Sequence, residues 1–364
     1  MNASTPYSFS SLATHMHLWL RAAISSDLLL LVTEMVIIGV SLIVFLVLLC
    51  FFLGWMERKV AAFMEIRLGP NRVGPMGSMQ IVADTVKLLF KEGLTPNASD
   101  KFLFNLAPGI MVVTSMLAVA PIAFAKNFQI WDVNIGVLYV SSISSMAVIG
   151  ILMAGWSSSN KYSLIGAMRS GAQIVSYELS IGLSLISIVI LSGSLQLSEI
   201  VESQANGWWL FKGHIPVIIS FVIFVIASTA EINRAPFDLT EAEQELTGGF
   251  HTEYSGMKFA MFLLSEYINL FIVSAIAATI FLGGWMPLHI GTWASFNHIM
   301  DFIPSSIWFL GKTFFIIFII MQFRWTFPRL RIDQLLNLEW KYLLPISMVN
   351  IIIVTAMAIF GWHF

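Results

Sequence analysis

A dense group of carboxylates lies between two long apolar runs of this chain. The segment 230–254, AEINRAPFDLTEAEQELTGGFHTEY, contains one cation, Arg234, and six acids, which are Glu231, Asp238, Glu241, Glu243, Glu245 and Glu253. Carboxylates that crowd together beside a low-dielectric phase repel one another and bind protons at unusual pH values. The chemistry that this pattern predicts is proton binding and transfer.

The local sequence divides this segment into a helix end, a break and a second short helix. Glu231 is expected to end the preceding helix, and Asn233–Pro236 to break it, because Pro236 disfavours a helical conformation of the residue before it. Thr240 and Glu243 have the spacing of a capping box, which predicts the start of a short helix. On that helix Glu241 and Glu245 would share one face, and such a like-charge pair destabilises a helix unless a partner or a proton compensates it.

Two further carboxylates stand alone inside apolar runs. Glu178 lies in VSYELS and Glu266 lies in FLLSEY. A charged carboxylate inside a bilayer costs on the order of a few kcal/mol, so an intramembrane acid is by default a functional candidate. The plainer alternative for Glu178 is a protonated side chain that hydrogen-bonds a neighbouring helix. We interpret both residues as a continuation of the acidic segment into the membrane.

The composition identifies the class of protein. Hydrophobic residues make up 57% of the chain and charged residues only 11%, whereas a soluble domain has about 25% charged residues. The apolar runs recur along the whole length, which indicates an all-α polytopic membrane protein. Cys50 is the single cysteine, and the sequence contains no glycine-rich nucleotide loop. We therefore expect that the chain itself holds no flavin, nicotinamide, iron–sulfur cluster or other metal.

Eight apolar runs have roughly the length of 17–25 residues that a bilayer-crossing helix needs. Residues 31–364 are thus predicted to form a single membrane domain. Residues 1–30 are predicted to form an N-terminal extension with an interfacial helix around Leu18–Ile24. The predicted spans are Met35–Trp55, Leu103–Phe124, Val137–Trp156, Ala172–Leu191, Ile215–Ala230, Phe259–Gly283, Trp308–Phe323 and Leu343–Trp362.

The cations are sorted between the loops. Fifteen of the 19 Lys and Arg residues lie in the four loops that follow odd-numbered spans. By the positive-inside rule these loops face the cytoplasm and both termini face the periplasm. The predicted fold is therefore about eight transmembrane helices with long cytoplasmic loops that contain short amphipathic helices.

The loop after the first span holds a second set of candidate residues. Glu57 and Arg58 lie at the membrane edge, where a plain interfacial anchor is the simple alternative. The stretch Leu68–Gly77 contains two Gly-Pro pairs that fix a tight backbone course around Arg72. A headgroup or protein contact and an ordinary turn are both compatible with that course. Ser78–Glu92 is predicted to be an amphipathic helix on the membrane or at the wall of a cavity.

The polar residues of two segments have alternative partners. Asp84 and Lys87 share the polar side of the amphipathic helix, where they are either solvated or a paired lining of a polar cavity. In the loop after the seventh span, acids are interleaved with Arg324, Arg329 and Arg331. Lipid headgroups or an acidic partner protein are expected to bind these arginines, and the interleaved acids favour the protein.

Six motifs occur in order along the chain. They are E-R-K at Glu57–Lys59, G-P-N-R-V-G-P at Gly69–Pro75, A-D-x-x-K-L at Ala83–Leu88, E-x-N-R-A-P-F-D-L at Glu231–Leu239, E-x-E-x-E-L at Glu241–Leu246 and T-E-Y-S-G-M at Thr252–Met257. With these motifs the chain resembles, from about Val32 to the C-terminus, the H subunit family of bacterial respiratory NADH–quinone oxidoreductase. Its mitochondrial counterpart is subunit 1 of NADH dehydrogenase. The loop departs mildly from the family pattern, with E-I-N-R for E-T-N-R, and keeps the carboxylates.

The resemblance implies a membrane anchor that docks a peripheral electron-transfer arm and forms the floor of a quinone chamber. Quinone would be the substrate, and FMN and iron–sulfur clusters are expected in partner subunits. The acids would connect quinone reduction to proton-pumping subunits. By motif, the chamber and docking residues are Glu57, Arg58, Arg67, Arg72, Asp84, Lys87 and Arg234, and the proton-path residues are Glu178, Glu231, Glu241, Glu243, Glu245, Glu253 and Glu266.

The same resemblance implies a bacterial cytoplasmic (inner) membrane location. The implied partners are peripheral quinone-site and iron–sulfur subunits, small membrane subunits, antiporter-like subunits and lipid, with no nucleic acid. The nearest alternative is an equivalent subunit of a complex linked to ferredoxin, F420 or a hydrogenase, although the complete G-P-N-R-V-G-P favours a quinone-type complex. A stand-alone ion-coupled transporter would also contain intramembrane acids, but the sequence gives little support for broken helices at mid-bilayer. A purely structural anchor would tolerate substitution of the carboxylates.

Overall fold

The chain folds almost entirely into helices. The computed structural model describes residues 17–22, 26–126, 128–205, 207–238, 247–289 and 293–362. Two short strands, β1 (Ala123–Ala125) and β2 (Phe128–Gln129), pair antiparallel. Within the described residues, eight helices are long and apolar enough to cross a membrane. This confirms the prediction of an all-α polytopic membrane protein.

The eight spans follow the predicted order. The last is a continuous helical stretch, Ile332–Phe360, with a π-helical turn inside it. The spans are α2 (Asp27–Met64), α4 (Lys101–Ala118), α5 (Gly136–Ser157), α6 (Lys161–Ser192), α9 (His214–Glu231), α11 (Gly256–Phe281), α13 (Ser305–Thr326), and the stretch made of α14 (Ile332–Leu338), η3 (Glu339–Leu343) and α15 (Leu344–Phe360).

The structure corrects the bounds of four spans. The fourth begins at Lys161 rather than at Ala172, and the last begins at Ile332 rather than at Leu343. The first was predicted to end at Trp55, but α2 continues to Met64 and therefore carries Glu57 and Arg58 on the helix rather than in a loop. The second was predicted to reach Phe124, but α4 ends at Ala118. Pro121 follows three residues later, and a proline disfavours helical backbone before it, so the chain turns into β1 instead.

The segment before the first span is described only in part. Residues 17–22 are helical, which overlaps the predicted interfacial helix, whereas residues 23–25 lie outside the described part of the chain. His17 in that short helix contacts Glu34 on α2 at 2.6 Å. The division into an extension and a single membrane domain stays a prediction.

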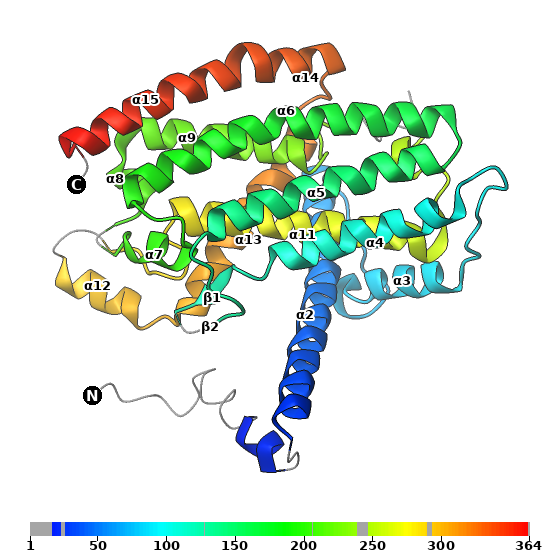
Figure 1. Ribbon diagram of the computed structural model, residues 1–364, viewed down its shortest axis with the longest axis horizontal. Helices are drawn as coiled ribbons and strands as arrows, with labels where there is room; N and C mark the ends of the chain where they lie inside the picture. The colour runs from blue at the N-terminus through cyan, green and yellow to red at the C-terminus, as the bar shows by residue number, and fades with distance from the viewer. Residues whose placement is uncertain are drawn as a thin grey trace.

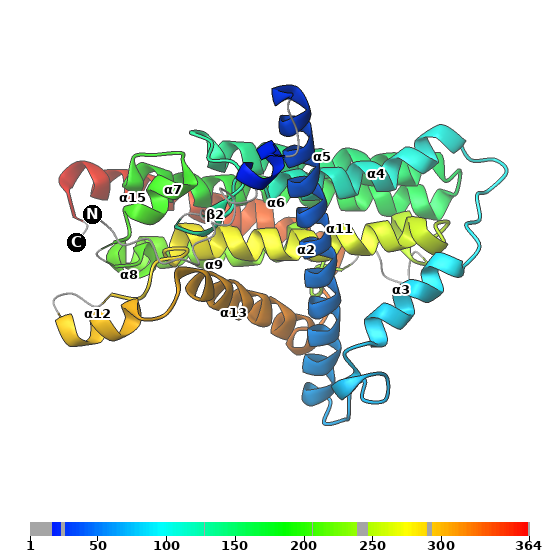
Figure 2. The same ribbon diagram turned by 90° about the horizontal axis from the view of Figure 1, so that it is seen from below.

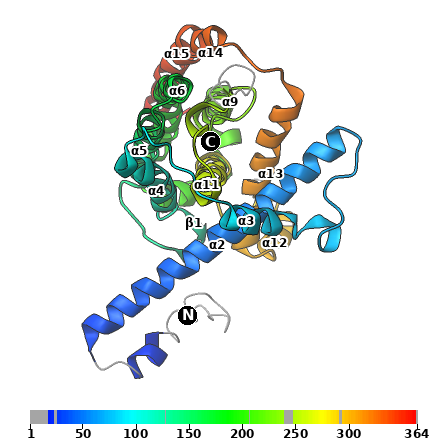
Figure 3. The ribbon, with the colours of Figure 1, turned by 90° about the vertical axis from the view of Figure 1, so that its right-hand side faces the viewer.

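Helix α11 lies at the centre of the bundle. Nearly all of its residues from Leu270 to Phe281 are buried, and it packs against α4, α13, α2 and α3. Helix α6 packs against α5, α9 and α15. In Figure 1, α4, α5, α6, α9, α11 and α15 run nearly parallel, whereas α2 crosses them steeply, and its N-terminal part projects from the bundle (Figures 1 and 3).

Short elements lie at the two ends of the bundle. Figure 2 shows α7 (Leu197–Glu202), α8 (Trp209–Lys212) and α12 (Ala294–Asp301) at one end and α3 (Gln80–Phe90) toward the other. Helix α3 follows the turn η1 (Pro75–Gly77) and packs against α2 and α11. It lies within the predicted amphipathic helix, and every one of its residues is at least partly exposed.

The turn η2 (Gly249–His251) docks closely on α6 just before α11 begins. Gly166 on α6 permits this contact, because a Cβ atom there would lie 2.7 Å from the Cα of Gly249. Ser163 on α6 also donates through Oγ to the carbonyl oxygen of Phe250 at 2.9 Å. The contact fixes the end of the acidic segment against the bundle.

We expect Gly166→Ala to weaken this contact. The new methyl group would force η2 and α6 apart, and such overpacking typically costs about 1–3 kcal/mol. Gly182→Ala on the same helix is the matched control, since a Cβ there meets no atom within 4 Å. Thermal unfolding of the purified complex in detergent should show a lower midpoint for Gly166→Ala alone. Equal midpoints for both variants would show that the close approach is not required.

Candidate functional site

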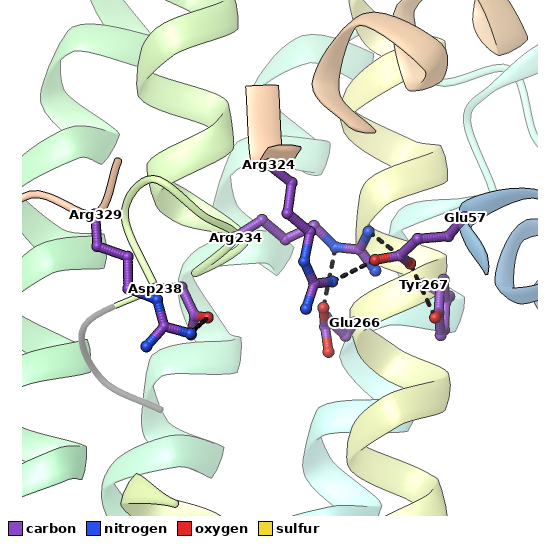
Figure 4. Close-up of polar contacts among 7 residues, drawn as sticks. All are labelled: Glu57, Arg234, Asp238, Glu266, Tyr267, Arg324 and Arg329. Carbon is purple, nitrogen blue, oxygen red and sulfur yellow. Dashed lines mark hydrogen bonds and ion pairs between the residues drawn. The ribbon is translucent and has the colours of Figure 1, made fainter. Parts of the chain in front are cut away.

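The loop that follows α9 is pinned to α6. Gln173 on α6 donates through Nε2 to the carbonyl oxygens of Ala230 (2.8 Å) and Phe237 (3.0 Å), which lie at the two ends of the loop. Asn233 has a left-handed φ of 53°, which asparagine tolerates because its short polar side chain bonds locally, and its amide donates to α6. These contacts hold the backbone so that the Arg234 side chain points toward α2 and α11 (Figure 4).

Arg234 is the centre of a buried ion-pair cluster. Its Nη1 donates to Glu57 Oε2 on α2 at 3.0 Å, and its Nε donates to Glu266 Oε1 on α11 at 3.0 Å. Tyr267 on α11 donates its hydroxyl to Glu57 Oε2 at 3.0 Å, and its ring lies under the guanidinium, 4.9 Å from ring centroid to Cζ. Arg324 on α13 donates to the other oxygen of Glu57 (Figure 4). Four separate parts of the chain therefore meet at this cluster.

The charges of the cluster balance within the protein. Two arginines face two glutamates, and Arg234 is only 3% exposed. Burial lowers the pKa of Arg234, but the carboxylates of Glu57 and Glu266 outweigh it and raise that pKa above its ordinary value. The guanidinium consequently stays charged, and it ties the first span to the central helix.

A second ion pair extends from the same loop. Arg329 donates through Nη2 to Asp238 Oδ2 at 3.1 Å, and the amide of Leu330 donates to the carbonyl oxygen of Pro236 at 3.2 Å. Burial raises the pKa of Asp238, and the positive charge of Arg329 opposes that shift. The loop after the seventh span is thus bound to the acidic loop. Its arginines were predicted to bind lipid or a partner, but two of them, Arg324 and Arg329, pair inside the chain, whereas Arg331 is exposed.

Two cavities lie beside the cluster and share part of their lining. The first, of about 180 Å³, is lined by Glu266, Glu231, His251 and Ser144 among mostly apolar side chains. The second, of about 580 Å³, is lined by Glu178 and again by Glu231 and Ser144. Since a water molecule needs only about 15 Å³ of such space, both cavities have room for water. Burial lowers the pKa of His251 to about 4, so its imidazole is neutral at pH 7.

Glu178 and Glu231 lie near hydroxyl groups, whereas Glu266, the third carboxyl of the two cavities, is bound to Arg234. Ser145 on α5 donates through Oγ to Glu178 Oε1 on α6. Ser144 lies within hydrogen-bonding reach of Glu231, and Glu178 is near enough to act on Glu231 electrostatically. Two ionised carboxylates in one apolar space repel each other.

The other predicted chamber residues form smaller contacts. Arg58 donates to Asp84 on α3 at 2.6 Å, and Gln80 donates to the second oxygen of Asp84 at 3.2 Å. The predicted alternative of an Asp84–Lys87 pair is therefore wrong, because Arg58 on the extended α2 occupies that carboxylate. Lys87 is exposed. In the loop before α3, Arg72 and Arg67 are exposed, and Arg67 pairs with Glu65.

The remaining acids of the opening segment divide into two groups. Glu253 accepts a hydrogen bond at 2.6 Å from Asn160, the residue that caps the N-terminus of α6. Glu241, Glu243 and Glu245, together with the predicted capping box and short helix, lie outside the described residues. Among the residues that the structure describes, no group of three or more His, Cys, Asp or Glu side chains is placed to hold a metal ion.

Sequence reasoning missed four residues that complete the site. Tyr267 directly follows Glu266, and this position beside a predicted site residue was the one signal in the sequence that could have identified it. Ser144 and Ser145 lie in an apolar run that is rich in serine, and nothing in their spacing distinguishes them from packing residues. Arg324 is far from Glu57 in the chain, and only the fold brings the two together.

The chain is similar to a well-populated family. A family model described as NADH dehydrogenase matches residues 37–355. A Bacteroides fragilis protein, named as the H subunit of an NADH-quinone oxidoreductase, is 56% identical over 98% of this chain and 100% of its own length. A Rhodothermus marinus protein named NADH-quinone oxidoreductase subunit 8 is 47% identical over 83% of this chain and 90% of its own length. The H subunit of Brevibacillus brevis is 46% identical over 82% of this chain and 85% of its own length.

Arg234→Met should destabilise the protein strongly, because it leaves Glu57 and Glu266 with less compensating charge. Breaking a buried ion pair by removing one partner costs about 3–5 kcal/mol. In a double-mutant cycle, Glu57→Gln combined with Arg234→Met should cost clearly less than the sum of the single variants. Thermal unfolding of the purified complex measures the stability of the unmodified protein, of both single variants and of the double variant.

The exposed Arg58–Asp84 pair provides the matched control for that cycle. Its side chains are 46% and 38% exposed, so Arg58→Met should cost only about 0–1 kcal/mol. Additive effects in the Arg234 cycle, or equal losses for Arg58→Met and Arg234→Met, would contradict the assignment of the buried cluster as the tie between helices.

Proposed function

Because this chain belongs to the NADH dehydrogenase family, we propose that it forms part of the quinone chamber and begins the proton path in its complex. Its relatives are subunits of NADH–quinone oxidoreductase, and its eight apolar helices make it a multi-pass membrane subunit. The observation that carries the proposal is the placement of Glu266. This carboxylate binds Arg234 and also lines the first cavity, which Glu231 shares with the second.

The cluster connects the side where quinone would bind to the first cavity. Glu57 and Arg58 are neighbours on α2, and Arg58 reaches Asp84 on α3, so the chamber residues inferred by motif are joined from α3 to Arg234. Reduction of a quinone takes up two protons and creates negative charge on its oxygens before they are neutralised. Such a charge near Glu57 and Arg234 raises the proton affinity of the neighbouring carboxylates.

The proton path then follows the cavity walls. The negative charge of the reduced quinone attracts the guanidinium of Arg234. Glu266 then loses part of its compensating charge and accepts a proton at its carboxylate. Water in the first cavity passes that proton to Glu231, and Ser144 stands at the boundary that both cavities share. Glu178, held by Ser145, receives it on the other side of this boundary. Glu241, Glu243, Glu245 and Glu253 are proposed to supply this path from the acidic loop.

Partner subunits are proposed for both ends of the path. Arg72 in the loop before α3 and Lys87 on α3 are exposed, as is Arg67, which pairs with Glu65, and a peripheral arm would dock on this part of the chain. That arm would carry the FMN and iron–sulfur clusters, and antiporter-like subunits would receive the charge signal within the membrane. In this arrangement the charged loops face the cytoplasm of a bacterial cell and the termini face the periplasm.

Glu231→Gln and Glu178→Gln should each slow proton-coupled quinone reduction by about tenfold or more, since a positioned proton-transfer group contributes about 10²–10⁴-fold to a rate. The amide keeps the shape and most of the hydrogen bonding but cannot carry the proton. NADH-driven quinone reduction and proton uptake by the purified complex in liposomes measure both effects. Glu199→Gln is the control, since the Glu199 side chain is exposed on α7.

A wild-type rate and a wild-type proton stoichiometry in both variants would contradict the proposed proton path. An assembled complex that reduces quinone with NADH but pumps no protons, even in its unmodified form, would also contradict it. Hydrogen or reduced ferredoxin as the effective donor would place the chain in a related complex of the same family.

A further inference from the structure

One buried carboxyl lies outside the path described above. Glu339 begins the π-helical turn η3 and is 0% exposed. Its Oε1 accepts a hydrogen bond from Ser180 Oγ on α6. Among the described residues it has no ion pair with a cation. A carboxylate buried without a counter-charge is costly, so this side chain favours its neutral, protonated form.

Glu339 is short of one hydrogen bond in either protonation state. Its Oε2 is buried and has no partner in the described part of the chain. If the carboxyl is ionised, Oε2 needs a donor, and if Oε2 carries the proton, that proton needs an acceptor. A buried polar atom of this kind calls for an unseen partner, and a water molecule serves as either donor or acceptor.

A row of buried polar side chains continues from Glu339 between α6, α9 and α15, and we call it the seam. Ser184 donates to the carbonyl of Ser180 (2.8 Å) and Ser187 to that of Ser184 (2.6 Å). The hydroxyl of Ser187 then meets that of Ser220 on α9 at 2.8 Å, and Asn350 on α15 donates to Ser220 at 2.7 Å. The seam consists of Glu339, Ser180, Ser184, Ser187, Ser220 and Asn350, all of which are less than 5% exposed.

The far end of the seam, like the near end, has a buried polar atom that lacks a hydrogen-bond partner among the described residues. Asn350 Oδ1 is buried and unpartnered among the described residues, like Glu339 Oε2. Glu339 and Asn350 are eleven residues apart on one helical stretch, which is roughly 16 Å at 1.5 Å per residue. The seam thus extends over about half of a hydrocarbon core of about 30 Å.

The seam is separate from the second cavity, which Glu178 lines. Glu178 and Ser180 are both on α6, but Glu178 contacts α5 through Ser145, whereas Ser180 contacts η3 through Glu339. A row of serines by itself is ordinary packing between membrane helices. Packing does not account for an acid without a counter-charge or for open acceptors at both ends. Nor does it require the π turn that places Glu339, a feature frequent at functional sites.

We propose that Glu339 is a proton-holding group that exchanges its proton with water bound in the seam. The proton leaves Oε2 for that water, and the carboxylate that remains is held by Ser180 and by the water until it is protonated again. The seam would serve as a second branch for protons, on the face of α6 opposite to Glu178. This inference rests on the proposed function, because the branch matters only in a complex that moves protons.

The test uses the complete complex in liposomes with Glu339→Gln, which keeps size and hydrogen bonding but holds no titratable proton. Infrared difference spectra on quinone reduction should lose the C=O band of a protonated carboxyl that the unmodified complex shows. The ratio of pumped protons to electrons should fall, while Ser180→Ala should shift the band without removing it. Glu199→Gln is the control, because its exposed side chain lies outside the seam.

The outcomes separate this proposal from the proposed function. If Glu231→Gln lowers pumping but Glu339→Gln leaves both the spectrum and the proton ratio unchanged, Glu339 is a packing residue and the inference is overturned. If neither variant changes pumping, the proton path itself fails. Should Glu339→Gln not assemble, the spectrum of Ser180→Ala decides, since an unshifted band excludes Glu339 as its source.

Discussion

An arginine buried between carboxylates from two different helices is the constraint on which the rest of this structure depends. Arg234 cannot leave this position without taking away the arginine that pairs with Glu266 and one of the two arginines that face Glu57. To place it there, α9 must end at Glu231 and the next residues must turn back over α6. Helix α2 must also extend far enough to carry Glu57 to the same point. The position of the Arg234 guanidinium therefore requires both the length of α2 and the break after α9.

The two kinds of carboxyl in the protein differ in what holds them. Glu57 is surrounded by two arginines and a tyrosine hydroxyl, which stabilise its ionised form and fix its position. Glu178 and Glu339 are held by single serine hydroxyls, and Glu231 lies between two cavities. In the proposed function, groups of the second kind gain and lose protons. A charge that appears beside the rigid cluster would then be answered by protons in these groups, which is the property that energy coupling needs.

The sequence predicted most of the fold and about half of the site. Span order followed from apolar runs, and the break at Pro236 followed from its backbone restriction, because both depend on neighbours in the chain. We predicted that Glu57 and Arg58 lie beyond the first span, because their charges end the apolar run although the helix continues. Hydropathy cannot predict the pairing of Glu57 with Arg324, because the two residues are distant in the sequence and only the fold brings them together. Glu339 was missed as a buried acid because its neighbours, Trp340 and Lys341, are typical of a membrane interface.

The central claim is that Glu266 and Glu231 are joined by water across the first cavity while Glu266 remains bound to Arg234. A structure of the whole complex with a quinone analogue bound, at a resolution that shows ordered water, tests this claim most directly. The account predicts an unbroken row of water molecules from Glu266 to Glu231 and an analogue placed on the side of the cluster that carries Glu57. A dry cavity closed by apolar side chains, with the analogue bound and Arg234 turned away from Glu266, would contradict it.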